Sequence, residues 1–445
     1  MGAVKKDLHV AIIGAGMGGL AAALALAKQG FTHIEVYEHA SNLGFVGAGI
    51  QLAPNMARIL DRLGCWSPIE AEATDIKETK IFQGDTEVEL AHIALPHIRE
   101  TYGYAHMVGH RSNLAGSIYE SCKAKKASIS FFFATAASEI VSFGPKPSFT
   151  ATPRKGGAPY TVTADVILAA DGIKSVVRPQ IMRELGVDAD VEDTGQAAYR
   201  IMLKREDMAH DPELIALLDA DRVTRWIGQR KHIIAYPVAN KNVYNLSTAH
   251  PDTSFAAAPS ATYTTKGSKS SMLDMYADFC PRVLKMLNLV PDGEVCEWKL
   301  RVHQPLPTWV HGSVALVGDA CHPTLPHLNQ GAAQAIEDAA VLSVVLAKCP
   351  SASAEDINKS LRVYEAVRKE RATVLVGLAA ASGKALHLGE GEAKKERDRQ
   401  FAALKDKKGG SVPDKWADAD VQKMIYGHDC MKVAEDEFYD IFKSF

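Results

Sequence analysis

Short apolar runs at the start of the chain are separated by a longer run rich in alanine and leucine. The apolar runs His9–Ile13 and 34–37 have the length of strands. Residues 20–28, between them, have the composition of a helix, and Gly30 ends it. The pattern therefore predicts a strand, a helix and a second strand, which form the βαβ unit of a parallel sheet.

The next part of the chain has a less regular pattern. We interpret 44–55 as a glycine-rich loop, 56–63 and 112–124 as helices, and 144–159 as a second loop. The strands predicted here are 81–90, 128–133, 139–143, 160–163 and 165–169. The first of these alternates between apolar and polar residues, whereas the last is apolar throughout, as expected of a buried strand.

The pattern changes between residues 195 and 298, where strand-length runs follow one another without long helices. The strands predicted there are 197–203, 223–227, 232–237 and 243–248, with an irregular loop at 252–271. They indicate an antiparallel sheet. The chain then returns to a buried strand at 313–317, helices at 331–347 and 355–380, and a charged run at 390–408 that is typical of a solvated helix or loop.

A chain of 445 residues is too long for one simple core. We assign 1–180 and 301–384 to the two parts of one α/β domain, which is Rossmann-like. Residues 181–300 form an inserted antiparallel-sheet domain for the substrate, and 385–445 form a charged, helical C-terminal segment.

Composition excludes several classes of protein. The net charge of -3 gives no electrostatic basis for binding nucleic acid or an anionic membrane. Seven cysteines without a Cys-x-x-Cys pair indicate no disulfide framework and favour a reducing, cytoplasmic location. The uncharged stretch 10–27 contains four glycines in a fixed pattern, so we expect neither a signal peptide nor a membrane span.

The first motif with chemical meaning is Gly14-Ala-Gly16-Met-Gly-Gly19, which lies between the first strand and the first helix. Glycines there allow backbone N–H groups to approach a pyrophosphate, and the helix turns its positive end toward that anion. Glu38 ends the second strand, where a carboxylate can accept hydrogen bonds from a ribose. The motif predicts a bound dinucleotide; a glycine-rich packing turn is the structural alternative.

Two further motifs follow buried strands. One is the turn Asp171-Gly172, and the other is Gly318-Asp319, which continues to Gly331. Together the three motifs resemble the group A flavoprotein monooxygenases, aromatic hydroxylases that use one FAD. The resemblance covers roughly residues 8 to 380 and implies a fold like that of para-hydroxybenzoate hydroxylase.

The resemblance implies roles for individual residues. Asp319 would bind the ribityl chain of FAD, and the helix that begins at Gly331-Ala332 would face the pyrimidine end of the flavin. Asp171-Gly172 would be shared between FAD and NAD(P)H. Arg111 would contact FAD, with a structural salt bridge as its alternative. The complete cofactor-binding set is Gly14, Gly16, Gly19, Glu38, Gly49, Arg111, Asp171, Gly172, Gly318, Asp319, Gly331 and Ala332.

Within this group the chain looks most like salicylate hydroxylase and 6-hydroxynicotinate 3-monooxygenase. The resemblance rests on 47–55, on 318–340 and on the late segment 426–429. His327 lies in Thr-Leu-Pro-His, as in salicylate hydroxylases. It would act as a base or as a hydrogen-bond partner of a phenolate; shaping of the turn is its alternative role.

Three residues complete the predicted substrate site. Arg200 would pair with a carboxylate or phenolate, and Tyr236 would hydrogen-bond the substrate, as in fungal phenol-hydroxylating relatives. Their alternatives are an interdomain ion pair for Arg200 and a core aromatic for Tyr236. Gln51 would also line the site, where hydroxynicotinate enzymes have a histidine, so the pyridine substrate is less favoured. We therefore predict Arg200, Tyr236 and His327 as both catalytic and substrate-binding, and Gln51 as substrate-binding.

The family's chemistry implies that NADH or NADPH reduces FAD and that O2 adds at flavin C4a. The hydroperoxide then hydroxylates an electron-rich ring. We expect a phenolic aromatic acid as substrate, salicylate above all, with or without loss of its carboxylate to give catechol. The alternatives are another phenol or polyketide hydroxylase, an epoxidase, and a non-catalytic flavin-binding protein. The histidines are not spaced like zinc ligands on one helix, so we expect no metal. We expect a monomer or homodimer.

Overall fold

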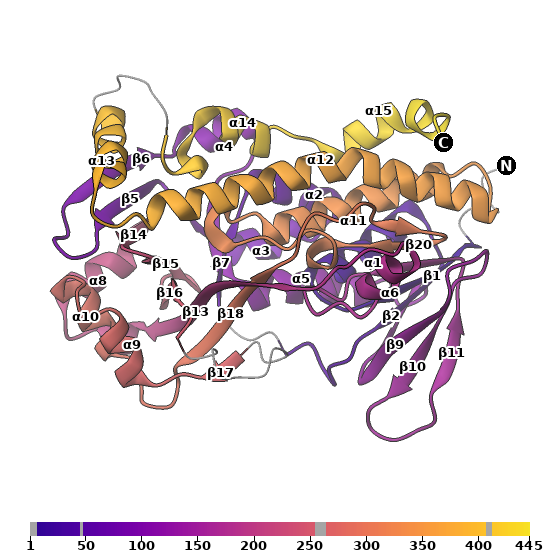
Figure 1. Ribbon diagram of the computed structural model, residues 1–445, viewed down its shortest axis with the longest axis horizontal. Coiled ribbons are helices and arrows are strands. Elements are labelled where there is room, and N and C mark those ends of the chain that lie inside the picture. Colours follow the sequence, from indigo (N-terminus) through magenta and orange to yellow (C-terminus); the bar gives the residue numbers. More distant parts are fainter. Residues whose placement is uncertain (1–6, 45–47, 254–263, 406–411) are drawn as a thin grey trace.

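The computed structural model describes residues 7–44, 48–253, 264–405 and 412–445. Two large sheets lie toward opposite ends of the molecule, and long helices run across both of them (Figure 1). None of the helices in these described ranges is long and apolar enough to cross a membrane. Residues 45–47 of the predicted glycine-rich loop, 254–263 of the predicted irregular loop and 406–408 of the predicted charged run lie outside the described residues, as do 409–411.

The N-terminal sheet confirms the predicted βαβ unit. Its six strands follow the order β19-β20-β12-β1-β2-β8, and every neighbouring pair except β19–β20 is parallel. Helix α1 (Met17–Gln29) joins β1 to β2. The strands are β1 (His9–Ile13), β2 (His33–Tyr37), β8 (Ile129–Phe132), β12 (Val166–Ala169), β19 (Val310–His311) and β20 (Val314–Leu316). Parallel strands place their carboxyl ends at one edge, so the glycine turn and the turns Asp171-Gly172 and Gly318-Asp319 meet there.

The second large sheet has eight strands in the order β17-β18-β13-β16-β15-β14-β5-β6. It is antiparallel as expected, except that β14 and β5 pair in parallel. Two of its strands, β5 and β6, come from the first 180 residues, so the sheet crosses the boundary predicted at residue 180. The strands are β5 (Glu78–Gln83), β6 (Glu89–Ala94), β13 (Glu192–Lys204), β14 (Arg222–Gly228), β15 (Lys231–Val238), β16 (Val243–Pro251), β17 (Thr264–Lys266) and β18 (Cys296–Val302).

The prediction of one strand over 81–90 is wrong. β5 and β6 form a hairpin in which Ile81 pairs with Ala91. The chain turns at Gly84–Thr86, and the carboxylate of Asp85 accepts the N–H of Thr86. Glycine and aspartate are turn residues, and here the turn outweighs the alternating pattern on either side of it.

Two predicted loops contain strands. β10 (Ser148–Pro153), within 144–159, pairs with both β9 (Thr135–Ser142) and β11 (Tyr160–Thr163), and its Phe149 and Ala151 are completely buried. β3 (Gly49–Leu52), within 44–55, pairs with β7 (Met107–His110), which also pairs with β4 (Thr74–Asp75). The loop 44–55 was predicted from its glycines and 144–159 as an interruption between strands, whereas pairing with other strands decides the structure of both.

Several short helices cover one face of the eight-stranded sheet and were not predicted. They are α7 (Arg205–Met208), α8 (Pro212–Asp219), α9 (Lys269–Met275) and α10 (Pro281–Asn288), and α9 begins inside the predicted loop 252–271. Asp211 accepts the N–H groups of Glu213 and Leu214, and Pro212 is the first residue of α8. This cap and proline are sequence signals for a helix start. Leu217, Met286 and Trp226 belong to the resulting core.

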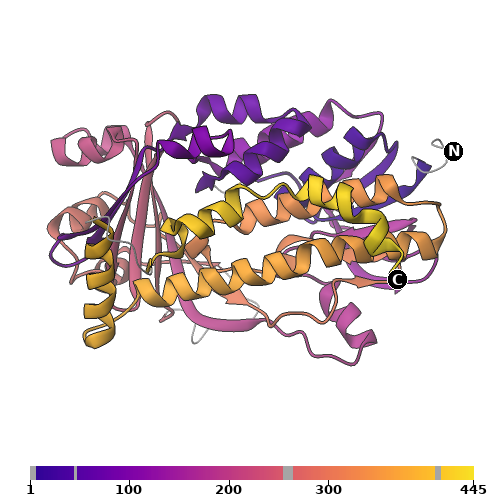
Figure 2. The ribbon, with the colours of Figure 1, turned by 90° about the horizontal axis from the view of Figure 1, so that it is seen from above.

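A layer of helices joins the two large sheets. α11 (Gly331–Lys348) packs against α1 and against α12 (Ala354–Leu386), which extends along the molecule toward the eight-stranded sheet (Figures 1 and 2). The remaining elements are α2 (Pro54–Leu63), α3 (Trp66–Glu72), α4 (His97–Tyr102), α5 (Arg111–Lys123), α6 (Arg178–Glu184), α13 (Glu392–Lys405), α14 (Ala419–Tyr426), α15 (Cys430–Phe442), and the short 3-10 helices η2 (Gly318–Ala320), η3 (Pro326–Leu328) and η4 (Lys415–Ala417).

The C-terminal segment is bound to the eight-stranded sheet through a buried ion pair. Arg225 of β14 and Asp414 are almost inaccessible, and Nη1 of Arg225 donates to Asp414 across 2.6 Å. The other oxygen of Asp414 accepts a hydrogen bond from Ser382 of α12. Because a buried ion pair requires both partners, this contact fixes the sheet, α12 and the C-terminal segment together.

Candidate active site

The glycine turn between β1 and α1 is closely packed on one side and open on the other. Gly14 has a φ of +101°, and a Cβ there would collide with the carbonyl oxygen of Ala170. A Cβ on Gly19 would likewise collide with the carbonyl oxygen of Gly14. A Cβ on Gly16, by contrast, would meet no atom within 4 Å. The first turn of α1 has no acidic residue and no capping side chain, so the turn offers free N–H groups to an anion.

Glu38 is fixed beside this turn. One of its carboxylate oxygens accepts the N–H of Ala15 at 2.8 Å, and the other accepts the N–H of Ala40 at 2.7 Å. The side chain remains half-buried, so part of it is accessible. The predicted ribose acid thus lies next to the predicted pyrophosphate turn.

The turn after β12 is joined to the turn after β20. Asp171 accepts the N–H groups of Val176 and Val177 and so closes its own turn. Gly172 has a φ of +73°, and a Cβ there would meet no atom within 4 Å. Arg178 is buried and donates both to the carbonyl of Ile173 and to that of Ala320. The second and third motifs therefore form one structural unit.

Asp319 interacts electrostatically with His322 and Arg111 in this unit. Its side chain is exposed, yet burial among protein atoms raises the pKa of its carboxyl, against the opposing effects of His322 and Arg111. Burial lowers the pKa of Arg111 in turn, and Asp319 opposes that shift. Within the described residues Arg111 makes no ion pair, so its alternative role as a structural salt bridge is not seen there.

Asp338 of α11 holds the Gly318-Asp319 turn through a set of buried contacts. Its carboxylate accepts the N–H of Gly318 at 2.9 Å, and the same oxygen lies 2.6 Å from Nε2 of His322. Its other oxygen accepts a hydrogen bond from Arg368 of α12 at 2.9 Å. Burial would raise the pKa of Asp338, but His322 and Arg368 lower it overall. The carboxylate is therefore charged and fully engaged.

The neighbouring Glu337 extends this network toward α2 and the end of α12. It accepts hydrogen bonds from Arg368 at 2.5 Å, from Arg371 at 2.8 Å and from Asn55 at 2.7 Å. Burial would raise its pKa, but the two arginines hold it well below the usual range. The network of Glu337, Asp338 and Arg368 was not predicted, although the sequence Glu337-Asp338 in an otherwise apolar helix was a signal for it.

The N-terminus of α11 is open. Gly331 and Ala332 are partly accessible, and the first turn has neither an acidic residue nor a capping side chain. Gln330 is buried, and its amide nitrogen has no hydrogen-bond partner within the described residues. An uncapped helix N-terminus with an unpartnered amide beside it suits an anionic or acceptor-rich ligand.

Arg200 is a cation without a counterion on the face of the eight-stranded sheet opposite its helices. Its guanidinium lies 4.5 Å from the centroid of the Trp298 ring, and it makes no ion pair within the described residues. Burial lowers its pKa to about 10, to which Arg111 also contributes. Within the described residues Arg200 therefore does not form the interdomain ion pair that was its alternative role. Its guanidinium is also only partly solvated.

Tyr236 shares this face with Asn245 and contacts the first domain. A Cβ on Gly49 would lie 2.6 Å from the rings or amide of both residues, so only glycine fits there. Asn245 accepts the N–H of Gly49 at 2.7 Å, and its own amide nitrogen is buried without a partner in the described part of the chain. Asn245 was not predicted; its register opposite Tyr236 is set by strand pairing that the sequence does not display.

Gln51 lies in a buried chain of hydrogen bonds. Its carbonyl oxygen lies 2.8 Å from Nε2 of His106, whose other ring nitrogen faces the hydroxyl of Tyr426, and Tyr426 in turn accepts from Trp416. The chain links β3 to the C-terminal segment. This contact engages Gln51 with protein rather than leaving its carbonyl for a substrate.

His327 is buried and has no partner for either ring nitrogen within the described residues. It packs so closely on Gly383 of α12 that a Cβ there would collide with its ring. His232, on the sheet face that carries Tyr236, lies edge-on to it at 5.3 Å, and His387 lies at 5.5 Å. Burial lowers the pKa of His327 to about 3. The imidazole is therefore neutral near pH 7.

A cavity of about 460 Å³ lies between His327, the start of β13 and the end of α12. Gln196, Arg230 and Lys384 also line it. Arg111 affects the pKa of Arg200, Arg200 affects that of Tyr236, and Asp319 affects that of Arg111, so these four side chains lie in one region. His327 instead lies beside His232 and this cavity.

These features define a dinucleotide-binding protein built on two large sheets. The open glycine turn, the accessible carboxylate of Asp319 and the uncapped N-terminus of α11 fit the pyrophosphate, the ribityl chain and the pyrimidine end of a flavin dinucleotide.

Comparison with known proteins defines the class further. A model of the FAD-binding-domain family matches residues 7–379. The FAD-dependent monooxygenase atnJ of Arthrinium sp is 32% identical over 397 residues, which are 89% of each chain. 3-Hydroxybenzoate 6-hydroxylase 1 of Aquipseudomonas alcaligenes is 32% identical over 342 residues, 76% of this chain and 81% of the relative. A salicylate hydroxylase–substrate complex shares the fold, with a TM-score of 0.77 and 24% identity over 97% of this chain and 98% of that one.

The chain therefore belongs to the FAD-binding-domain family of FAD-dependent monooxygenases, and FAD is its cofactor. The predicted family, cofactor and enzyme class are confirmed. The roles of the individual site residues remain predictions.

We expect Gly16→Ala to weaken FAD binding without unfolding the protein. A methyl group fits the protein itself at this position, and would occupy the space that a pyrophosphate needs. The dissociation constant of FAD, measured by flavin fluorescence, should rise at least about tenfold, or about 1.4 kcal/mol. Gly116→Ala, which also adds a methyl group to open space, should bind FAD as the natural protein does. Unchanged affinity in Gly16→Ala would remove this turn from the cofactor site.

We expect stability to fall as the pH drops from 7.5 to 5. Burial lowers the pKa of His327 to about 3 and of His387 to about 4, and that of His232 well below its ordinary value. Below pH 6.5 the unfolded chain therefore binds protons that the folded protein does not, and the free energy of unfolding decreases by about 2 kcal/mol per neutral histidine at pH 5. Urea unfolding at both pH values measures this. His387→Gln should make the decrease smaller, and the exposed His97→Gln should not; an equal decrease in both would contradict the assignment.

Proposed function

We propose that this enzyme uses NADH or NADPH and O2 to hydroxylate a phenolic aromatic acid, with salicylate as the first candidate. The observation that carries the proposal is the position of Arg200. This cation has no counterion among the described residues, and it lies on the sheet face near Arg111. An incompletely solvated guanidinium favours a carboxylate or phenolate partner, with which it forms paired, charge-assisted hydrogen bonds.

The surroundings of Arg200 support an aromatic acid. The Trp298 ring at 4.5 Å from its guanidinium holds the cation in place and adds an aromatic surface. Arg111 influences the pKa of Arg200, so the two cations lie near one another. Two such cations raise the affinity of the region for an anion.

Tyr236 and Asn245 supply neutral polar groups to the same region. Burial raises the pKa of Tyr236, so its hydroxyl stays protonated at neutral pH and can donate a hydrogen bond. The unpartnered amide nitrogen of Asn245 is a second buried donor. Donors of this kind orient a phenol and stabilise negative charge on its oxygen during attack.

For His327 we favour a hydrogen bond over proton abstraction. An imidazole whose pKa is lowered to about 3 is a weak base. In its neutral form it still offers one donor and one acceptor, both unpartnered within the described residues.

FAD, once reduced by the nicotinamide, supplies the oxygen-activating chemistry when it is bound. The protein's part is to bind the cofactor at Gly16, Asp319 and the start of α11. It must also keep water from the reacting ring and hold the substrate's charge with Arg200.

A larger, neutral substrate is the second candidate. The relatives include atnJ, whose name specifies a monooxygenase but no aromatic acid. The cavity of about 460 Å³ beside His327 offers room for a substrate larger than salicylate. A polyketide hydroxylase or an epoxidase would use the same cofactor region.

The proposal is tested with the FAD-loaded enzyme and a panel of salicylate, 3-hydroxybenzoate, 6-hydroxynicotinate and a phenol without a carboxylate. We expect oxidation of NADH or NADPH to be coupled to one added oxygen for a phenolic acid, with CO2 release showing whether the carboxylate leaves. In Arg200→Gln the KM of that acid should rise roughly 10- to 100-fold, because a charge-assisted hydrogen bond contributes about 1.5–3 kcal/mol. The KM of the neutral phenol should change far less.

Arg205→Gln is the matched control, because Arg205 pairs with Asp219 at the surface and should leave both KM values unchanged. An enzyme that oxidises only neutral, apolar substrates would contradict the aromatic-acid proposal and support the second candidate. An equal rise in KM for acid and phenol in Arg200→Gln would remove the charge-binding role.

A further inference from the structure

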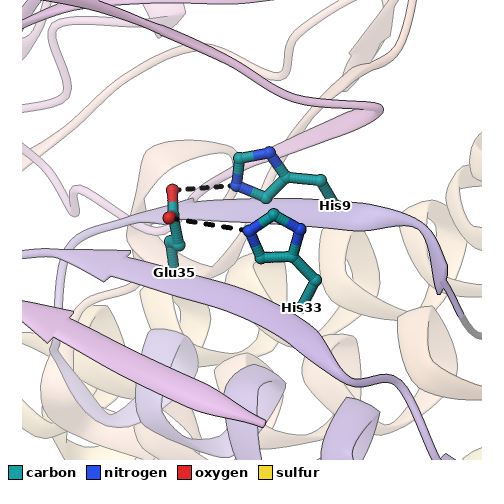
Figure 3. Close-up of side chains that lie close together, drawn as sticks. All are labelled: His9, His33 and Glu35. Carbon is teal, nitrogen blue, oxygen red and sulfur yellow. Dashed lines mark hydrogen bonds and ion pairs between the residues drawn. The ribbon is translucent and has the colours of Figure 1, made fainter.

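Two histidines and a glutamate meet at the amino-terminal ends of β1 and β2 (Figure 3). His9 and His33 are the first residues of these strands and are partners in the parallel register. Glu35 lies two residues after His33, on the same face of β2. Nε2 of His9 is 2.8 Å from one oxygen of Glu35, and Nε2 of His33 is 3.7 Å from the other. Strand pairing therefore places three metal-ligand side chains together.

The two imidazole rings lie face to face beside one carboxylate. They stack with centroids 3.8 Å apart and planes 3° apart, and both turn Nε2 toward the same carboxylate (Figure 3). The three donor atoms lie within 4.8 Å of one another. An imidazole binds a metal ion in the plane of its ring, so the two rings must tilt toward each other to bind one ion. The His33 side chain is 55% exposed and therefore has room for that rotation.

The carboxylate is oriented by a residue outside the cluster. The hydroxyl of Tyr37 donates to Glu35 at 2.7 Å, and the Tyr37 ring is held by stacking on Phe132 at 4.7 Å and by edge contact with Phe149 at 5.1 Å. Burial would raise the pKa of Glu35, but the hydrogen bonds of Tyr37 and His9 lower it overall. A charged carboxylate that a buried phenol holds in place has the support that metal ligands usually receive.

We propose that His9, His33 and Glu35 form a Zn²⁺ site with two imidazole nitrogens, one carboxylate and water in the remaining position. This donor set is typical of zinc, which imposes no geometry of its own, whereas Mg²⁺ and Ca²⁺ require oxygen ligands. The side chains are 17%, 55% and 20% exposed, so the ion can enter from solvent.

A second group of potential ligands is less suitable. Cys321, His322 and Asp338 also lie close together, but all three are buried. Asp338 already accepts hydrogen bonds from Gly318 and Arg368 and lies beside His322. The Cys321 group therefore already holds the Gly318-Asp319 turn in place, whereas His9, His33 and Glu35 lie at the opposite end of the sheet.

The location predicts what the metal does. It joins the first residue of β1 to β2, at the edge of the sheet away from the Gly14 turn. Zn²⁺ that binds the folded protein and not the unfolded chain raises the unfolding temperature. Because the cluster is remote from Asp319 and Arg200, FAD affinity and turnover should not change.

The test is calorimetric titration of ZnCl2 into FAD-loaded enzyme that has been stripped with EDTA. We expect one site, and at least a tenfold loss of affinity in His33→Ala and in Glu35→Gln. Tyr37→Phe keeps the ring but removes the hydroxyl, and should weaken binding roughly 10- to 100-fold. Binding should also weaken at pH 5.5, because protons compete for the imidazole nitrogens.

His92→Ala is the matched control. His92 also pairs with a glutamate on a neighbouring strand, Glu78, at 2.7 Å. Among the described residues, however, no second histidine joins His92 and Glu78 to form a group of three potential metal ligands. It should bind Zn²⁺ as the natural protein does. The flavin spectrum and circular dichroism verify that each variant is folded. Absence of Zn²⁺ binding by the natural protein, or equal affinity in folded His33→Ala and His92→Ala, would overturn the proposal.

Discussion

The buried contact between Arg368 and two adjacent carboxylates, Glu337 and Asp338, is the constraint on which the cofactor side of this enzyme depends. Burying charged groups costs several kcal/mol each unless every one is paired and hydrogen-bonded. Here the pairing is complete only when α11, α12 and the turn after β20 are all in place, because Asp338 also accepts the N–H of Gly318. The same contacts that make α12 dock on α11 therefore set the backbone at Asp319. Stability and cofactor geometry are thus linked through one carboxylate.

The substrate side is assembled from parts of the chain that are far apart. Gly49 of β3 touches Tyr236 and Asn245 of the eight-stranded sheet, and only glycine allows that approach. The C-terminal segment fixes the other end of the arrangement through Asp414 on Arg225. Gln51 is joined to the same segment through Tyr426. The position of Arg200 relative to Arg111 is therefore a property of the whole molecule and not of one domain.

Local features were predictable from the sequence, and long-range pairing was not. The glycine turn, Glu38 and Gly318-Asp319 each follow directly from an apolar strand, so their structural context can be recognised in a few residues. β10 was missed because its partners β9 and β11 supply the pairing, and β5–β6 was misjudged because a turn was hidden in an alternating run. Asn245 and Trp298 could not be found, because their nearness to Tyr236 and Arg200 arises only when the sheet forms. His327 matched a family motif, but its depressed pKa depends on its burial and on the distant His387 and Arg225.

The most direct measurement is the dissociation constant of FAD in Asp338→Asn. This change keeps the shape of the side chain and removes the charge that binds Arg368, His322 and the N–H of Gly318. Glu365→Gln is the control, because Glu365 also joins α12 to the segment before β19, through Thr308 and Trp309, without touching the turn. If the carboxylate of Asp338 fixes the backbone of the Gly318-Asp319 turn, FAD affinity falls at least about tenfold in Asp338→Asn. It is unchanged in Glu365→Gln. Natural FAD affinity in a folded Asp338→Asn protein would contradict the account.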